Sequence, residues 1–138
     1  MSSAQDIRGA LQTVLDILPG FPAASQRGYD NVLFSGTPRV PWARITLSTV
    51  GGVPFSLAGD NHMENGTFLV CLYYPPDNGT AAVEAMADIV TAAYRASLIL
   101  TQGSARVMVT SVRRGPLLPE ADTIGAPVTV FWRALTSP

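Results

Sequence analysis

The order of apolar patterns over residues 64–135 limits this chain to few folds. Residues 67–74 (TFLVCLYY) are apolar on both sides of an extended chain, which predicts a strand at the centre of a sheet. An alanine-rich helix is predicted next, over 80–97, and two further strands follow over 106–112 and 127–135. This order predicts an α+β fold, in which a small, mostly antiparallel sheet of four to five strands packs against two helices.

Both predicted helices have a single apolar stripe at helical spacing, which indicates that each covers a core with one face. The first helix spans 4–18 and ends at Pro19-Gly20. Its stripe consists of Ile7, Leu11, Val14, Leu15 and Leu18, and that of the second helix consists of Val83, Met86, Ala87, Val90 and Tyr94.

The remaining segments complete one domain over residues 1–138. Residues 42–48 alternate apolar and polar side chains, which predicts a half-buried strand. Residues 19–41 are rich in proline and glycine without a sustained period, so we predict an irregular connector with one candidate strand at 31–34. Residues 49–63 read as a long glycine-bearing loop, which we expect to become ordered against a partner.

Charge is scarce in this chain. Charged residues make up 14% of the 138 residues, against about 25% in typical domains. We therefore expect partners or copies of the chain to cover part of the uncharged surface. The net charge of -1 gives no reason to expect nucleic-acid or anionic-membrane binding. No run approaches the ~18 apolar residues of a membrane span, and the start has no signal-peptide pattern, so we expect a soluble, intracellular product.

The residue types exclude most catalytic chemistry. All basic residues are arginine, so Schiff-base lysines and phosphate-binding P-loops are excluded. Cys71 is the only cysteine and lies in the most apolar strand, where we expect a buried, inert thiol. His62 stands between Asp60 and Glu64, which admits a metal or acid–base site, but one histidine offers too few ligands. We favour a solvated loop histidine and predict no cofactor.

Glu84, Asp88 and Arg95 share a polar stripe on the second helix. The two carboxylates, four residues apart, admit an acid–base pair. We favour a face that meets solvent or another subunit. Trp42 and Trp132 lack the basic surroundings of a base-stacking surface, so we expect both to pack.

Arg113 and Arg114 lie next to each other where a predicted strand ends. Adjacent strand residues point to opposite faces, so at least one of the two guanidinium groups should reach solvent or a partner. An intersubunit salt bridge is one interpretation. The alternative is an exposed pair that is neutralised locally by Glu120 or Asp122.

These segments together resemble the tail terminator proteins of long-tailed bacteriophages. The shared pattern starts with a strand ending in Tyr74-Pro75, a Gly-Thr turn and the alanine-rich helix. A strand closing on Arg114-Gly115-Pro116, an acidic turn and a final Pro-Val-Thr-Val strand at 127–130 follow. The resemblance is good over the second half of the chain, whereas residues 20–65 depart most from the pattern.

The resemblance implies a structural virion protein without enzymatic activity. Such proteins form a hexameric ring that caps the tail tube, ends tube polymerisation and offers a surface for joining the head. The implied partners are copies of the chain, the tail tube protein and the head–tail connector, with DNA passing through the lumen without specific binding. The implied location is the tail or neck of the virion, which is assembled in the bacterial cytoplasm.

Two rival functions stay open at this stage. One is another neck or head–tail joining protein, since these share size and ring symmetry. The other is a small intracellular enzyme or ligand-binding domain, which only Asp60, His62 and Glu64 favour.

Overall fold

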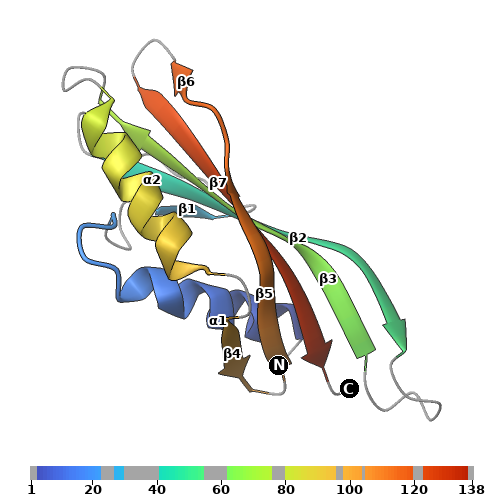
Figure 1. Cartoon of the computed structure of the whole chain (residues 1–138). Coiled ribbons are helices and arrows are strands. Elements are labelled where there is room, and N and C mark those ends of the chain that lie inside the picture. Colours follow the sequence, from blue (N-terminus) through green and yellow to red (C-terminus); the bar gives the residue numbers. More distant parts are fainter. Residues whose placement is uncertain are drawn as a thin grey trace.

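The computed structural model is a two-layer α+β structure, with two helices on one face of a twisted mixed sheet (Figure 1). It describes residues 3–22, 27–29, 41–54, 62–75, 80–95, 98–103, 105–119 and 123–136. The elements in chain order are α1 (Ser3–Asp16), β1 (Arg27–Tyr29), β2 (Trp42–Pro54), β3 (His62–Tyr74), α2 (Ala81–Ala93), β4 (Ile99–Gln102), β5 (Ala105–Arg114), β6 (Leu118–Pro119) and β7 (Ile124–Thr136).

The sheet has the strand order β1-β2-β3-β7-β5-β4, with β6 paired to β7. All pairs are antiparallel except the parallel pair β1–β2. The α+β class, the two helices and the mostly antiparallel pairing are therefore as predicted. The predicted count of four to five strands is wrong, because the described residues form seven. The additional strands β1, β4 and β6 have two to four residues each, which is too short to show a period in the sequence.

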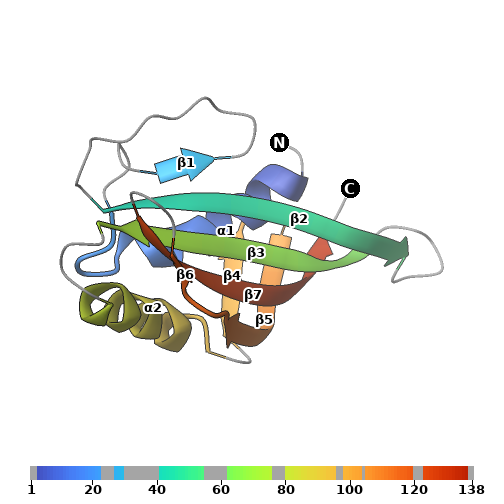
Figure 2. The same cartoon turned by 90° about the horizontal axis from the view of Figure 1, so that it is seen from above.

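The prediction of a loop over residues 49–63 is wrong at both of its ends. Strand β2 continues to Pro54 and β3 begins at His62, where these two residues pair. The register shifts between Thr49 and Gly51, because a glycine within a strand often marks a bulge rather than a loop. Figures 1 and 2 show this end of β2 and β3 extending beyond both helices. Asp60 lies outside the described residues.

The predicted connector over 19–41 contains β1, which pairs with the start of β2. The candidate strand at 31–34 lies outside the described residues. The first helix ends at Asp16, two residues before the predicted end, and the second ends at Ala93 with Tyr94 as its C-cap. The first difference is within the usual uncertainty of helix ends, whereas the second helix stops four residues before the predicted 97.

The core lies between the helices and one face of the sheet. Every residue of the predicted α2 stripe is buried, as are all of the α1 stripe except the half-buried Leu18. From the sheet, alternate residues of each long strand point into this layer, as the strand period requires. They include Ala43, Ile45, Phe68, Val70, Leu72, Val107, Val109, Val128, Val130 and Trp132.

Gly66 is the described glycine at which an added Cβ atom would meet the closest neighbour. A Cβ atom at this position would lie 2.0 Å from the backbone oxygen of Ser48 and 2.9 Å from the Trp132 ring. Only glycine therefore lets β2 and the Trp132 indole approach the centre of β3 this closely.

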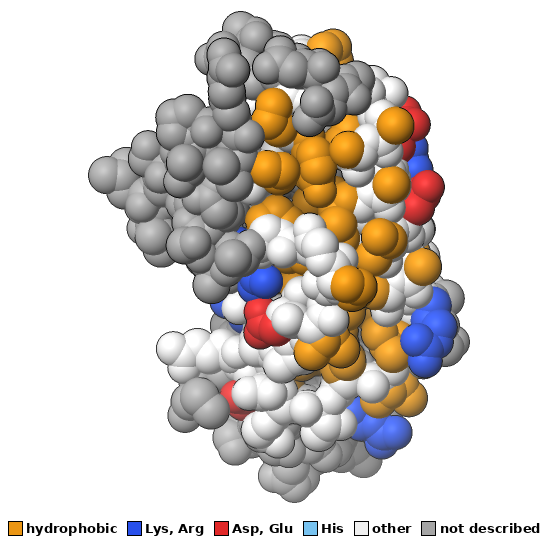
Figure 3. Space-filling view, turned by 90° about the vertical axis from the view of Figure 1, so that its left-hand side faces the viewer, with side chains coloured by type: hydrophobic (Ala, Val, Ile, Leu, Met, Phe, Trp, Pro, Cys, Tyr) orange, Lys and Arg blue, Asp and Glu red, His pale blue; other side chains and the backbone are white. Residues whose placement is uncertain are grey.

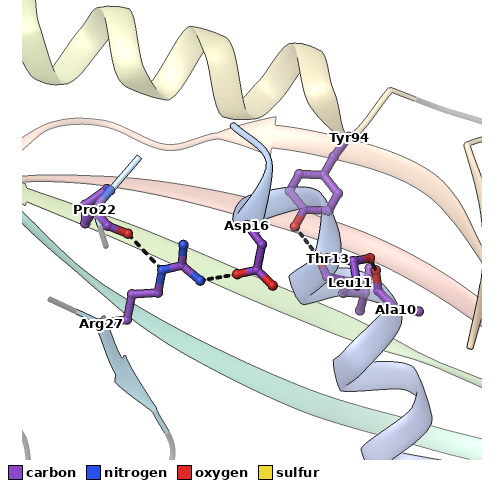
Figure 4. Close-up of polar contacts among 7 residues, drawn as sticks. All are labelled: Ala10, Leu11, Thr13, Asp16, Pro22, Arg27 and Tyr94. Atoms are coloured by element: carbon purple, nitrogen blue, oxygen red, sulfur yellow. Dashed lines mark hydrogen bonds and ion pairs between the residues drawn. The ribbon is translucent and has the colours of Figure 1, made fainter. Parts of the chain in front are cut away.

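Two buried side chains connect α1 to the rest of the molecule (Figure 4). The Arg27 guanidinium of β1 donates hydrogen bonds to Asp16 Oδ1 at 2.6 Å and to the carbonyl of Pro22 at 2.8 Å. The Tyr94 hydroxyl, at the end of α2, donates to the carbonyl of Leu11 in α1 at 2.5 Å. These contacts fix both β1 and α2 to α1, and burial raises the pKa of Tyr94 above its ordinary value.

Candidate functional site

The two adjacent arginines at the end of β5 point to opposite sides of the sheet, as predicted. Arg114 is paired in register with Val128, which is buried under the helices, whereas Arg113 is paired with Thr129. Directly paired residues point to the same side of a sheet, so Arg114 lies on the helix-covered side and Arg113 on the other.

Arg114 forms an ion pair with Asp88 of α2. The two side chains are 34% and 69% exposed, so solvent screens the attraction and it contributes little to stability. The local partners predicted from the sequence were the nearby acids Glu120 and Asp122, and both lie outside the described residues. Asp88 lies 26 residues before Arg114, so the pair appears only once α2 is placed over β5.

Glu84 and Asp88 lie on the exposed side of α2, and Arg95 is exposed just after it. The other exposed residues of this helix are mostly small and apolar. They include Ala82, Ala85, Ile89 and Ala92. Ile89 is 41% exposed. Figure 3 shows a strip of apolar side chains on this helix-bearing side, with charged groups at its margin. We call these residues the α2 face: Ala82, Glu84, Ala85, Asp88, Ile89 and Ala92.

The opposite side of the sheet is not covered by either helix (Figure 1). Its side chains alternate along each strand with the buried core residues. Within the described residues, it carries four exposed arginines and no aspartate or glutamate; Glu64 is paired with the buried Ala134 and so points to the other side. The arginines are Arg44 from β2, Arg106 and Arg113 from β5, and Arg133 from β7.

Partly exposed apolar side chains lie between these arginines. They are Trp42, Leu69, Tyr73, Met108, Phe131 and Leu135, and together with the four arginines we call them the open face. Trp42 stacks on Tyr73 with ring centroids 4.3 Å apart, and the Arg44 guanidinium lies 5.5 Å from the centre of the Trp42 ring. The prediction that Trp42 lacks basic surroundings is therefore wrong, because residues two apart on a strand share a face. Trp132 is buried, as predicted.

The open face contains a hollow of about 200 Å³. It lies where the register of β5 shifts, between Val109 and Ser111. Its lining consists of Asn65, Gly66, Thr67, Thr110, Phe131, Trp132 and Arg133. The hollow therefore combines an aromatic wall with one exposed guanidinium.

Comparison with known proteins gives these surfaces a context. The sequence model for phage tail terminator proteins matches residues 6–132. The chain belongs to this family. One solved structure is similar over 100% of this chain and 99% of its own, with a TM-score of 0.77. At 19% identity this second likeness concerns the fold alone. The comparison with curated proteins finds no match.

Membership of the phage tail terminator family makes this a structural protein of the phage tail. The residues that might have suggested catalysis do not form a site in the part of the chain that the structure describes. That part contains no group of three or more His, Cys, Asp and Glu side chains able to hold a metal ion. Cys71 is buried, as predicted. His62 belongs to β3 and not to a loop, so its predicted setting is wrong. None of the described helices is both long and apolar enough to cross a membrane.

Proposed function

We propose that copies of this chain form a ring of six subunits that caps the tail tube. The ring ends tube polymerisation and provides the surface to which the head is joined. The observation that carries this proposal is the family match over residues 6–132, which spans α2, most of α1 and nearly all of the sheet.

The arrangement of the two faces supports a ring. A cyclic head-to-tail assembly needs two different complementary patches on each subunit. The α2 face and the open face differ in shape and in charge, and they lie on opposite sides of the two-layer fold. The low share of charged residues, 14%, also suits a subunit whose surface is largely covered by neighbours.

The charged groups of α2 and of the end of β5 are the proposed subunit contacts. They are Glu84, Asp88, Arg95, Arg113 and Arg114, together with Glu120 and Asp122 from the segment between β6 and β7. Within one chain, Arg114 already forms an ion pair with Asp88. In addition to copies of itself, the proposed partners are the tail tube protein and the head–tail connector. DNA would pass through the lumen without specific binding, and the function requires no cofactor.

Deleting the gene from the phage that encodes this chain tests the proposal. We expect electron micrographs to show tails of irregular, mostly excessive length that are not joined to heads, because nothing ends tube growth. Supplying the wild-type chain from a plasmid should restore uniform, joined tails. Tails of normal length in the deletion phage would contradict the proposed termination. If such tails failed only to join heads, the chain would instead be a joining protein of the neck.

A further inference from the structure

The open face has the composition of the buried part of a protein interface. Such interfaces are enriched in aromatic residues, methionine and arginine, and depleted in lysine, aspartate and glutamate. Among its described residues, the open face carries three aromatic side chains, Met108 and four arginines, with no acid. Trp, Tyr and Arg are also the residues that most often dominate binding energy.

Three arginines of the open face have no carboxylate partner among the described residues. Arg106, Arg113 and Arg133 are exposed and form no ion pair within the described part of the chain. On the α2 face, the partly exposed Glu84 likewise has no cationic partner among the described residues. The unpaired charges on the two faces are therefore opposite in sign, which favours contact between them in different copies.

The shapes of the two faces are also compatible. Ala82, Ala85 and Ala92 let a second surface approach the α2 backbone closely, and Ile89 projects from the same side of the helix. The hollow beside Arg133, at about 200 Å³, exceeds the roughly 150 Å³ of a cavity that admits benzene, so it has room for an aliphatic side chain such as that of Ile89.

We infer that the open face of one copy binds the α2 face of the next, with Glu84 placed among the arginines Arg113 and Arg133. This inference rests on the proposed ring and names the two surfaces that would form it. A nucleic acid is the less suitable occupant, because apolar side chains separate the arginines and Trp42 is already stacked on Tyr73.

Disulfide trapping between two variants tests which surfaces meet. Ala85→Cys places a thiol on the α2 face and Thr129→Cys places one beside Arg113 on the open face. We expect a mixture of the two variants to form several times more disulfide-linked dimer under mild oxidation than either variant alone. Wild type, whose Cys71 is buried, is the control and should form none. Equal dimer from each variant alone, or no dimer in the mixture, would overturn the inference.

Charge reversal supplies a second test that separates contact from misfolding. We expect Glu84→Arg, and separately the double variant Arg113→Glu/Arg133→Glu, to weaken self-association by about tenfold or more in sedimentation experiments. Combining all three changes in one chain should restore most of the loss. Failure to restore association, with unchanged circular dichroism, would reject this pairing of charges. Binding of a labelled DNA duplex by wild type that the double arginine variant loses would show that the face binds nucleic acid instead.

These outcomes are distinguishable from failure of the proposed function. If the deletion phage makes overlong tails but no mixed dimer forms, the terminator function stands and the choice of surfaces is wrong. If mixed dimers form while the deletion phage makes normal tails, the contact stands and the terminator function is wrong.

Discussion

Replacing Tyr94 with phenylalanine should change stability in a way that depends on pH. The variant loses one buried hydrogen bond, from the hydroxyl to the carbonyl of Leu11. The Leu11 carbonyl also lies within α1, where it can accept a hydrogen bond from the backbone N–H of Leu15. Removing the hydroxyl therefore does not leave this carbonyl without a hydrogen-bond donor. We therefore expect the free energy of unfolding near pH 8 to fall by about 1 kcal/mol, the usual net contribution of such a bond.

At alkaline pH the same hydroxyl group becomes a disadvantage to wild type. Burial raises the pKa of Tyr94 in the folded state above its ordinary value of 10.0, and the Asp16 carboxylate adds to this while Arg27 opposes it. The folded chain keeps the proton while the unfolded chain loses it, so stability is fully present below pH 10 and falls as the pH rises further. By pH 11 this costs wild type slightly more than about 1 kcal/mol, which the phenylalanine variant does not lose.

The free energies of unfolding of wild type and Tyr94→Phe should therefore cross between pH 10 and pH 11. Urea unfolding followed by tryptophan fluorescence at several pH values from 8 to 11 measures both. Val90→Ala is the matched control, because Val90 is buried in the same helix and has no titrating group; its cost should be the same at every pH. A difference between wild type and Tyr94→Phe that stays constant across this range would show that Tyr94 does not keep its proton in the folded state.

Two further predictions concern the core. Gly66→Ala should lower the free energy of unfolding by about 3 kcal/mol, because the new Cβ atom would lie 2.0 Å from the Ser48 carbonyl oxygen. The control is Gly9→Ala in α1, where the new Cβ atom meets only a flexible side chain at 3.3 Å. In urea unfolding, this control should stay within about 1 kcal/mol of wild type. Asp16→Asn should cost about 1 kcal/mol, because it removes the charged partner of the buried Arg27 guanidinium; an unchanged thermal midpoint would show that the Pro22 carbonyl suffices.

The periodic elements of this fold could be predicted from the sequence. Nearly all residues of the predicted apolar stripes of α1 and α2 are buried in the structure. Helical spacing alone determines which side chains share a face of the helix, so it was sufficient for this prediction. The central strand at 67–74 was equally clear from its apolar residues. In contrast, the glycines and polar residues at the far end of β2 and β3 predict a loop, although the two strands pair there. That pairing depends on the partner strand, which local sequence does not contain.

The open face is the part of the site that the sequence analysis missed. Arg44 was visible on the polar side of its strand, but Arg106 and Arg133 belong to strands far away in the chain. Strand order and register bring the four arginines to one surface, and neither can be read from a single strand. The ion pair of Arg114 with Asp88 was hidden for the same reason. The signal that was available is the alternation within each strand, which already separates Arg113 from Arg114.

Tube growth in the presence of the purified chain tests whether this protein ends polymerisation of the tail tube. Tail tube protein from the same phage is allowed to polymerise, the chain is added in small excess over tube ends, and tube lengths are measured by electron microscopy over time. We expect elongation to stop on addition and a ring to become visible at one end of each tube. Glu84→Arg should stop growth less effectively at the same concentration. Tubes that continue to lengthen at the original rate, with wild-type chain present and folded, would contradict the proposed termination.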